Sequence, residues 1–129
     1  MAAATRIHDH AGCVIEEENG LLRANVGPGL AEEVQRCYRA LATACVTGQC
    51  TRVLIIGHGT LDPFYHLAGR DALRSMALAG VAANFRLALV AKSAGLIAVY
   101  DAAVVEAGRH NIDARRFMTE EEAEGWLKG

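Results

Sequence analysis

Apolar residues run without interruption through residues 53–56, and this run indicates a strand in the interior of a sheet. Three of its four residues are β-branched, and Gly57-His58-Gly59-Thr60 follows at once. A strand that is buried on both faces has this pattern, because neither set of its alternating side chains meets water. We therefore expect helices to cover both faces of the sheet or to wrap over one of them.

The segments Cys13–Glu18 and Leu21–Val26 predict a β-hairpin at the start of the chain. They flank Asn19-Gly20, a pair favoured in two-residue turns because both positions need a positive φ. The polar residues 1–10 are expected to form a flexible or loosely packed N-terminus. A helical connection after the hairpin should place residues 53–56 parallel to its second strand.

Four segments have the pattern of helices. Residues 30–48 carry apolar positions at a period of 3.6 and end at Gly48. A second helix is expected to begin between Gly69 and Asp71, and a third follows Ser93 as its N-cap and stops at Gly108 as its C-terminal cap. The last follows a capping box at residues 119–122, with an inward stripe of Ala123, Trp126 and Leu127.

Buried strands are also predicted at residues 87–91 and 114–118, which completes the order β-β-α-β-α-β-α-β-α. The expected fold is α/β: one mixed sheet of about five strands, the first antiparallel, with about four helices. A chain of 129 residues fits one domain, which we expect to span residues 1–129.

Composition removes several classes of function. The 13 basic and 15 acidic residues give a net charge of −2 and form no long run of one sign, so neither nucleic acid nor an anionic membrane is an expected partner. No apolar stretch has the length of a membrane span, and no secretory signal is evident, so a cytoplasmic protein is expected. The four cysteines lack metal-ligand spacing and are predicted to be reduced residues of the core.

The element order, together with three segments, resembles the SpoIIAA-like family, which is related to the STAS domains and to small SEC14-like α/β domains. The segments are residues 90–96 (VAKSAGL), Tyr100-Asp101 and residues 116–127 (RFMTEEEAEGWL). The resemblance covers nearly the whole chain and is most specific in the last strand, the capping box and the Trp-Leu helix. It implies a compact α/β domain that acts by binding a protein or a small ligand.

Ligands of open α/β sheets collect beyond the carboxyl ends of the parallel strands. Two loops occupy such positions in the predicted fold. Glycines allow a tight backbone in the first, the hydroxyls are hydrogen-bonding groups, and the free amides at a helix start beside a lysine would suit an anion. The candidate ligand-binding residues are Gly57, His58, Gly59, Thr60, Asp62 and His66 in the first loop, and Lys92 and Ser93 in the second.

Several readings of these loops remain open. The glycines could serve only to turn the chain, with His58 solvated or bonded to a carbonyl group. STAS proteins that act as anti-sigma-factor antagonists carry a phosphorylatable serine after the central strand. This chain has none there, so the resemblance implies such a switch only at Thr60. A small hydrolase would combine Ser93 or Thr60 with His58 and Asp62, although the sequence lacks a nucleophile elbow.

The leading prediction is a non-catalytic STAS-like binding or regulatory module, whose partner is a protein or a small anionic or lipid-like ligand. No cofactor and no metal site are predicted. The alternatives are a hydrolase-type enzyme that uses His58 and a phosphorylation switch at Thr60. A homodimer is also expected, because a chain this rich in apolar residues should leave helix surface uncovered, for example at Val104 and Val105.

Overall fold

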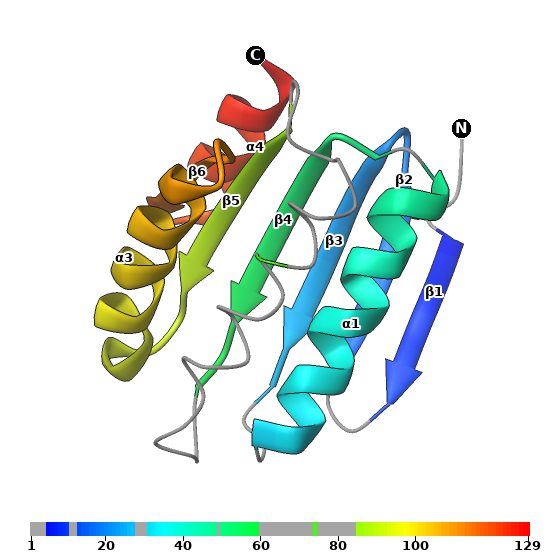
Figure 1. Ribbon diagram of the computed structural model, residues 1–129, viewed down its shortest axis with the longest axis horizontal. Coiled ribbons are helices and arrows are strands. Elements are labelled where there is room, and N and C mark those ends of the chain that lie inside the picture. The colour runs from blue at the N-terminus through cyan, green and yellow to red at the C-terminus, as the bar shows by residue number, and fades with distance from the viewer. Residues whose placement is uncertain (1–4, 11–12, 28–30, 49, 60–73, 75–84) are drawn as a thin grey trace.

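The architecture was analysed in a computed structural model of the chain, which describes residues 5–10, 13–27, 31–48, 50–59, 74 and 85–129. These residues form an α/β structure in which one mixed sheet carries helices on both faces (Figure 1). The second helix of the sequence prediction lies outside the described residues. No helix in the described ranges is long and apolar enough to cross a membrane.

The sheet has six strands in the described residues, and their spatial order is the same as their order along the chain, β1-β2-β3-β4-β5-β6. The first three are joined antiparallel, and β3 to β6 run parallel. The predicted hairpin is confirmed, with Asn19 and Gly20 at φ values of 53° and 81° in its turn. The strands are β1 (Thr5–His10), β2 (Cys13–Glu18), β3 (Leu21–Val26), β4 (Arg52–Gly57), β5 (Arg86–Ala91) and β6 (Asp113–Phe117).

The strand β4 lies inside the sheet between β3 and β5, as the apolar run predicts. Its side chains alternate between two cores, because successive residues of a strand point to opposite faces. Val53 and Ile55 are buried in the core on one face, and Leu54 and Ile56 are buried in the core on the other. This strand therefore links the two hydrophobic layers of the domain.

Two helices cover the first face, α1 (Ala31–Gly48) and α3 (Ala94–Arg109) (Figure 1). Cys37, Leu41 and Cys45 form the buried stripe of α1. The predicted C-terminal cap of α3 is wrong, because the helix continues past Gly108. Asn111 takes the left-handed conformation there, at a φ of 59°, and the amides that follow the helix donate to its last carbonyl groups.

The short helix α4 (Glu120–Lys128) covers part of the second face. The predicted cap is confirmed, since Thr119 Oγ1 accepts a hydrogen bond of 3.2 Å from the amide of Glu122. At the other end of the helix, Arg52 Nε donates to the carbonyl oxygen of Leu127 at 3.0 Å, and Arg86 donates to that of Trp126 at 2.9 Å. Two arginines from the starts of β4 and β5 thus hold the helix terminus on the sheet.

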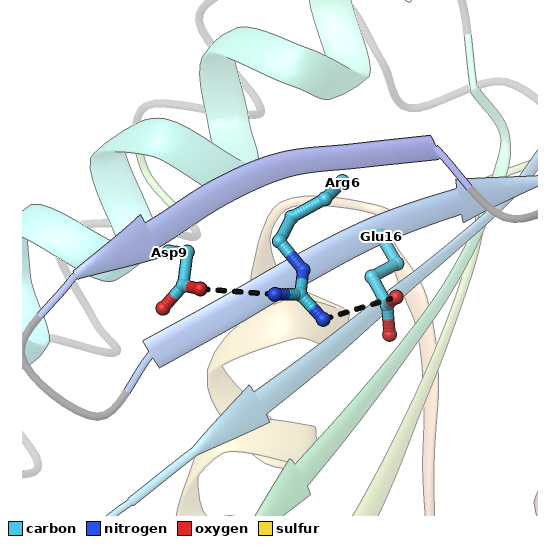
Figure 2. A network of polar contacts seen from close by, with 3 residues as sticks. All are labelled: Arg6, Asp9 and Glu16. Carbon is cyan, nitrogen blue, oxygen red and sulfur yellow. Dashed lines mark hydrogen bonds and ion pairs between the residues drawn. The ribbon is translucent and has the colours of Figure 1, made fainter.

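Residues 5–10 are ordered as the edge strand β1, where the sequence predicts a flexible or loosely packed segment. The additional strand accounts for a sheet of six strands where about five are predicted. Arg6 lies between two carboxylates, at 3.1 Å from Asp9 Oδ2 and 3.9 Å from Glu16 Oε2 (Figure 2). The sequence pattern does not predict this strand, because residues 5–10 lack the apolar alternation of a half-buried strand.

The cysteine prediction is wrong for two of the four residues. Cys13 at the start of β2 and Cys37 in α1 form a disulfide, with their Cα atoms 5.9 Å apart, whereas Cys45 and Cys50 are free thiols in the core. The bond joins positions 24 residues apart, and a loop of that size corresponds to a stabilisation of about 3 kcal/mol in chain-entropy models. It fastens α1 to the antiparallel part of the sheet.

The docking of α4 can be tested at Leu127, whose side chain is 3% exposed and packs in the second core. Replacing Leu127 with alanine should lower the free energy of unfolding by about 2–5 kcal/mol, because the change leaves a cavity against the sheet. Lys128→Ala, at an exposed neighbouring position, is the matched control and should change it by less than about 0.5 kcal/mol. Urea unfolding measures both, and a loss below about 1 kcal/mol for Leu127→Ala would contradict this packing.

Candidate functional site

The parallel strands β3, β4 and β5 end at the same edge of the sheet. Val26 pairs with Gly57, and Gly57 pairs with Ala91. The ladder continues one step beyond them, since the amide of His58 donates to the carbonyl oxygen of Val26 at 2.9 Å and the amide of Lys92 donates to that of Gly57 at 2.8 Å. His58 and Lys92 are therefore held in register on neighbouring strands, which lie about 4.8 Å apart in such a sheet.

Gly57 has a structural role at this edge. A Cβ atom at this position would lie 2.1 Å from the Tyr100 hydroxyl oxygen and 2.7 Å from Leu96 Cδ1, both on α3. The absence of a side chain thus lets α3 approach the end of β4 closely. Gly57 is itself buried, so its role is to position β4 and α3, and it does not contact a ligand at the site.

His58 is exposed and lies on the face opposite to Tyr100, because it follows Leu54 and Ile56 in the alternation of β4. Its ring is held by Asn25 of β3, with Nε2 donating to Asn25 Oδ1 at 3.1 Å. With Nε2 bonded in this way, Nδ1 is the ring nitrogen that can accept from a ligand or, when protonated, donate to it.

Asn25 is a site residue that the sequence analysis missed. It is a half-buried polar position near the end of β3, and it points to the same face as His58 because Ala24 and Val26 point to the other. The signal was present in principle. Pairing the two predicted parallel strands in register places position 25 opposite position 56, and position 58 is the next residue on the same face.

Lys92 and Ser93 bring a charge and a hydroxyl group to the same edge. Lys92 is exposed, and the alternation of β5 directs it to the face of Ala88 and Val90, which is also the face of His58. Ser93 occupies the N-cap position of α3 as predicted, but its side chain makes no capping hydrogen bond. Amides in the first turn of a helix have no partner within the helix and carry partial positive charge. We call Asn25, His58, Lys92 and Ser93 the strand-end rim.

The remaining candidates do not join this group in the described structure. Gly59 is described and is buried. Thr60, Asp62 and His66 lie outside the described residues, and with them the predicted phosphorylation switch and the acid of the predicted hydrolase. Within the described ranges, the bonded nitrogen of His58 faces an amide oxygen, and no hydrogen bond joins its ring to Ser93.

A cavity of about 460 Å³ lies at the opposite edge of the sheet, between the hairpin turn and the end of α4. Three of its charged side chains, Arg23, Arg52 and Glu124, already have structural contacts. Arg23 forms an ion pair with Glu124, and Arg52 donates to the carbonyl oxygen of Leu127. These contacts fasten α4 to β3 and β4, so this cavity is a weaker candidate for a ligand site than the strand-end rim.

The two free thiols are poor nucleophiles. The pKa of Cys45 is raised to about 12, first by burial and then by the neighbouring Cys50. The pKa of Cys50 is also raised, first by burial and then by the negative charge of Glu17. Both residues therefore remain protonated at neutral pH, which excludes them from the thiolate chemistry of reactive cysteines.

The role of Gly57 predicts a specific loss of stability. Gly57→Ala should reduce the free energy of unfolding by about 1–3 kcal/mol, because the added methyl group overlaps Tyr100 and Leu96. Gly108→Ala is the control, since a Cβ there meets nothing within 4 Å, and it should stabilise α3 by up to about 1 kcal/mol. Thermal unfolding compares the two, and equal effects would contradict the close approach of α3.

The buried thiol predicts a dependence of stability on alkaline pH. The unfolded chain loses the Cys45 proton near pH 9 and the folded chain near pH 12, so the thiol's contribution to stability is complete below pH 9 and falls as the pH rises towards 12. The slope is at most about 1.4 kcal/mol per pH unit. Urea unfolding between pH 8 and 10.5 should show a shallower decline for Cys45→Ala than for the parent chain. Identical slopes would contradict the raised pKa.

Comparisons with known proteins supply no family for this arrangement. No protein-family model, no curated protein and no solved structure matches the chain. The chemistry of the strand-end rim therefore has to be inferred from its own four side chains and from the strands that position them.

Proposed function

We propose that this chain is a non-catalytic binding or regulatory domain of the SpoIIAA-like, STAS-related type, and that it binds its partner at the strand-end rim. The observation that carries the proposal is the hydrogen bond from His58 to Asn25, which orients an exposed imidazole beside Lys92 at the carboxyl ends of three parallel strands. Ligands of open α/β sheets bind at this edge.

The proposed ligand group is an anion, a carboxylate or a phosphate, carried by a small molecule or by a protein partner. Lys92 supplies a positive charge, and Ser93 supplies a hydroxyl group that is not used for capping. The unbonded ring nitrogen of His58 is a further hydrogen-bonding group on the face of Lys92. Hydrogen bonds that involve a charged partner are the stronger kind, so an exposed rim can still bind an anion selectively.

A binding role is favoured over hydrolysis by the missing contact between His58 and Ser93. A general base must lie within hydrogen-bond reach of the group that it deprotonates, and within the described residues no hydrogen bond joins the His58 ring to the Ser93 hydroxyl group.

The test is isothermal calorimetry with a set of phosphate- and carboxylate-bearing metabolites. Lys92→Ala should weaken binding about tenfold, which corresponds to about 1.4 kcal/mol, because it removes the positive charge of the rim. Lys128→Ala is the matched control and should change the dissociation constant by less than about twofold, since it lies beyond the other edge of the sheet beside Arg52. Binding to the parent chain should also weaken as salt is added.

Two outcomes would count against the proposal. If none of the anions produced heat, the rim would be an ordinary set of loop residues. If Lys92→Ala and Lys128→Ala weakened binding equally, the attraction would come from overall charge and not from the rim. Turnover of an ester or phosphoester by the purified chain, lost in His58→Ala, would instead favour the hydrolase alternative.

A further inference from the structure

The two edge strands of the sheet, β1 and β6, differ in how easily a strand of another molecule could pair with them. In β1 the register shifts between Arg6 and His8, and Arg6 is fastened to its own side of the sheet by Asp9 and Glu16 (Figure 2). Bulges and charged side chains are the usual means by which edge strands avoid pairing with other chains. The opposite edge strand, β6, pairs with β5 over five residues without a shift.

Two exposed apolar side chains lie near the β6 edge. Met118, directly after β6, is 66% exposed, and Val105 of α3 is 61% exposed, the two highest values among the large exposed apolar residues described. Val105 follows Asp101 by one helical turn and so lies on the same flank of α3. Asp101 binds Arg116 of β6, with 2.5 Å between its Oδ1 and Arg116 Nε, which places this flank over the outermost strand.

The same ion pair shows which residue of β6 lies opposite Val105. Because α3 and β6 are joined by a tight connection, they run in opposite directions, and four residues along α3 advance about 6 Å towards the start of β6. Two residues of a strand span about 6.6 Å. Since Asp101 lies level with Arg116, Val105 lies level with Ala114.

The charges of β6 select one way in which it could pair with itself. A two-fold axis perpendicular to the sheet keeps the α3 helices of two copies on one face. Residues that pair directly must then point to the same face, so the axis lies level with one residue of β6, which pairs with its own counterpart. An axis at Asp113, Arg115 or Arg116 would place like charges directly opposite each other. An axis at Phe117 would leave Phe117 as the only residue of β6 that faces the partner's β6. An axis through Ala114 places Asp113 of each copy opposite Arg115 of the other, twice, and both side chains are exposed.

We propose that two copies of this chain associate through antiparallel pairing of their β6 strands about a two-fold axis at Ala114, which joins the two sheets into one. The charge pattern of β6 and the level of Val105 on α3 point independently to this axis. In the dimer Val105 lies opposite its counterpart, and only the last turns of the two α3 helices, residues 101–109, face each other across the axis. The proposal concerns a surface separate from the strand-end rim and goes beyond the proposed function.

Sedimentation at tens of micromolar tests the pairing through charge reversal. The parent chain should be a dimer. Asp113→Lys and Arg115→Glu should each raise the dissociation constant at least about tenfold, because each places like charges opposite each other twice. An equimolar mixture of the two variants should recover a dimer of parental affinity, since the Asp113→Lys copy then faces the Arg115→Glu copy with opposite charges at both contacts.

Two further variants separate the interface from general effects on folding. Val105→Asp should also yield monomers, and its high exposure means that the isolated domain should keep its stability. Arg6→Glu, at the β1 edge, is the matched control and should leave the dimer intact. A monomeric parent chain, a dimer indifferent to Asp113→Lys, or a mixture that fails to reassociate would each overturn the proposal.

Discussion

The burial of β4 on both faces is the constraint on which the rest of the domain depends. Val53 and Ile55 need one layer of helices and Leu54 and Ile56 need another, so neither α1 and α3 alone nor α4 alone could cover this strand. Apolar burial on both faces also requires neighbours on both sides, because the backbone groups of an interior strand need partners away from water. The strands β3 and β5 meet that need in parallel, and so the carboxyl ends of three strands come together.

The two ends of this parallel unit use their polar residues differently. At the amino end, Arg52 and Arg86 bind carbonyl groups in the last turn of α4, and Arg23 forms an ion pair with Glu124 in its middle. At the carboxyl end, Gly57 lets α3 approach closely, while His58 and Lys92 remain exposed. The arginines at the amino end are thus bound to α4, whereas the side chains of His58 and Lys92 at the carboxyl end are exposed to solvent. The proposed binding role rests on this difference.

Local patterns predicted the elements well where a single physical cause dominated. The turn at Asn19 and Gly20 follows from their tolerance of positive φ, and the start of α4 follows from the cap at Thr119. The predictions failed where distant contacts decide. The sequence predicts that α3 stops at Gly108, but Asn111 supplies the left-handed residue, and residues 5–10 form β1 through pairing with β2, a strand that the sequence does not predict. The disulfide required knowing that α1 crosses the start of β2.

The sequence by itself determined that residues 53–56 are interior, that helices follow the strands at residues 21–26 and 87–91, and that His58 and Lys92 follow strand ends. These features depend on side-chain period and turn chemistry, which act over a few residues. Only the tertiary structure decided that Asn25 orients His58, that Gly57 is a packing residue against Tyr100, and that β6 is an outer strand of the sheet. Each of these depends on the register between strands or on the level of a helix over a strand, and both are fixed by contacts between residues far apart in the chain.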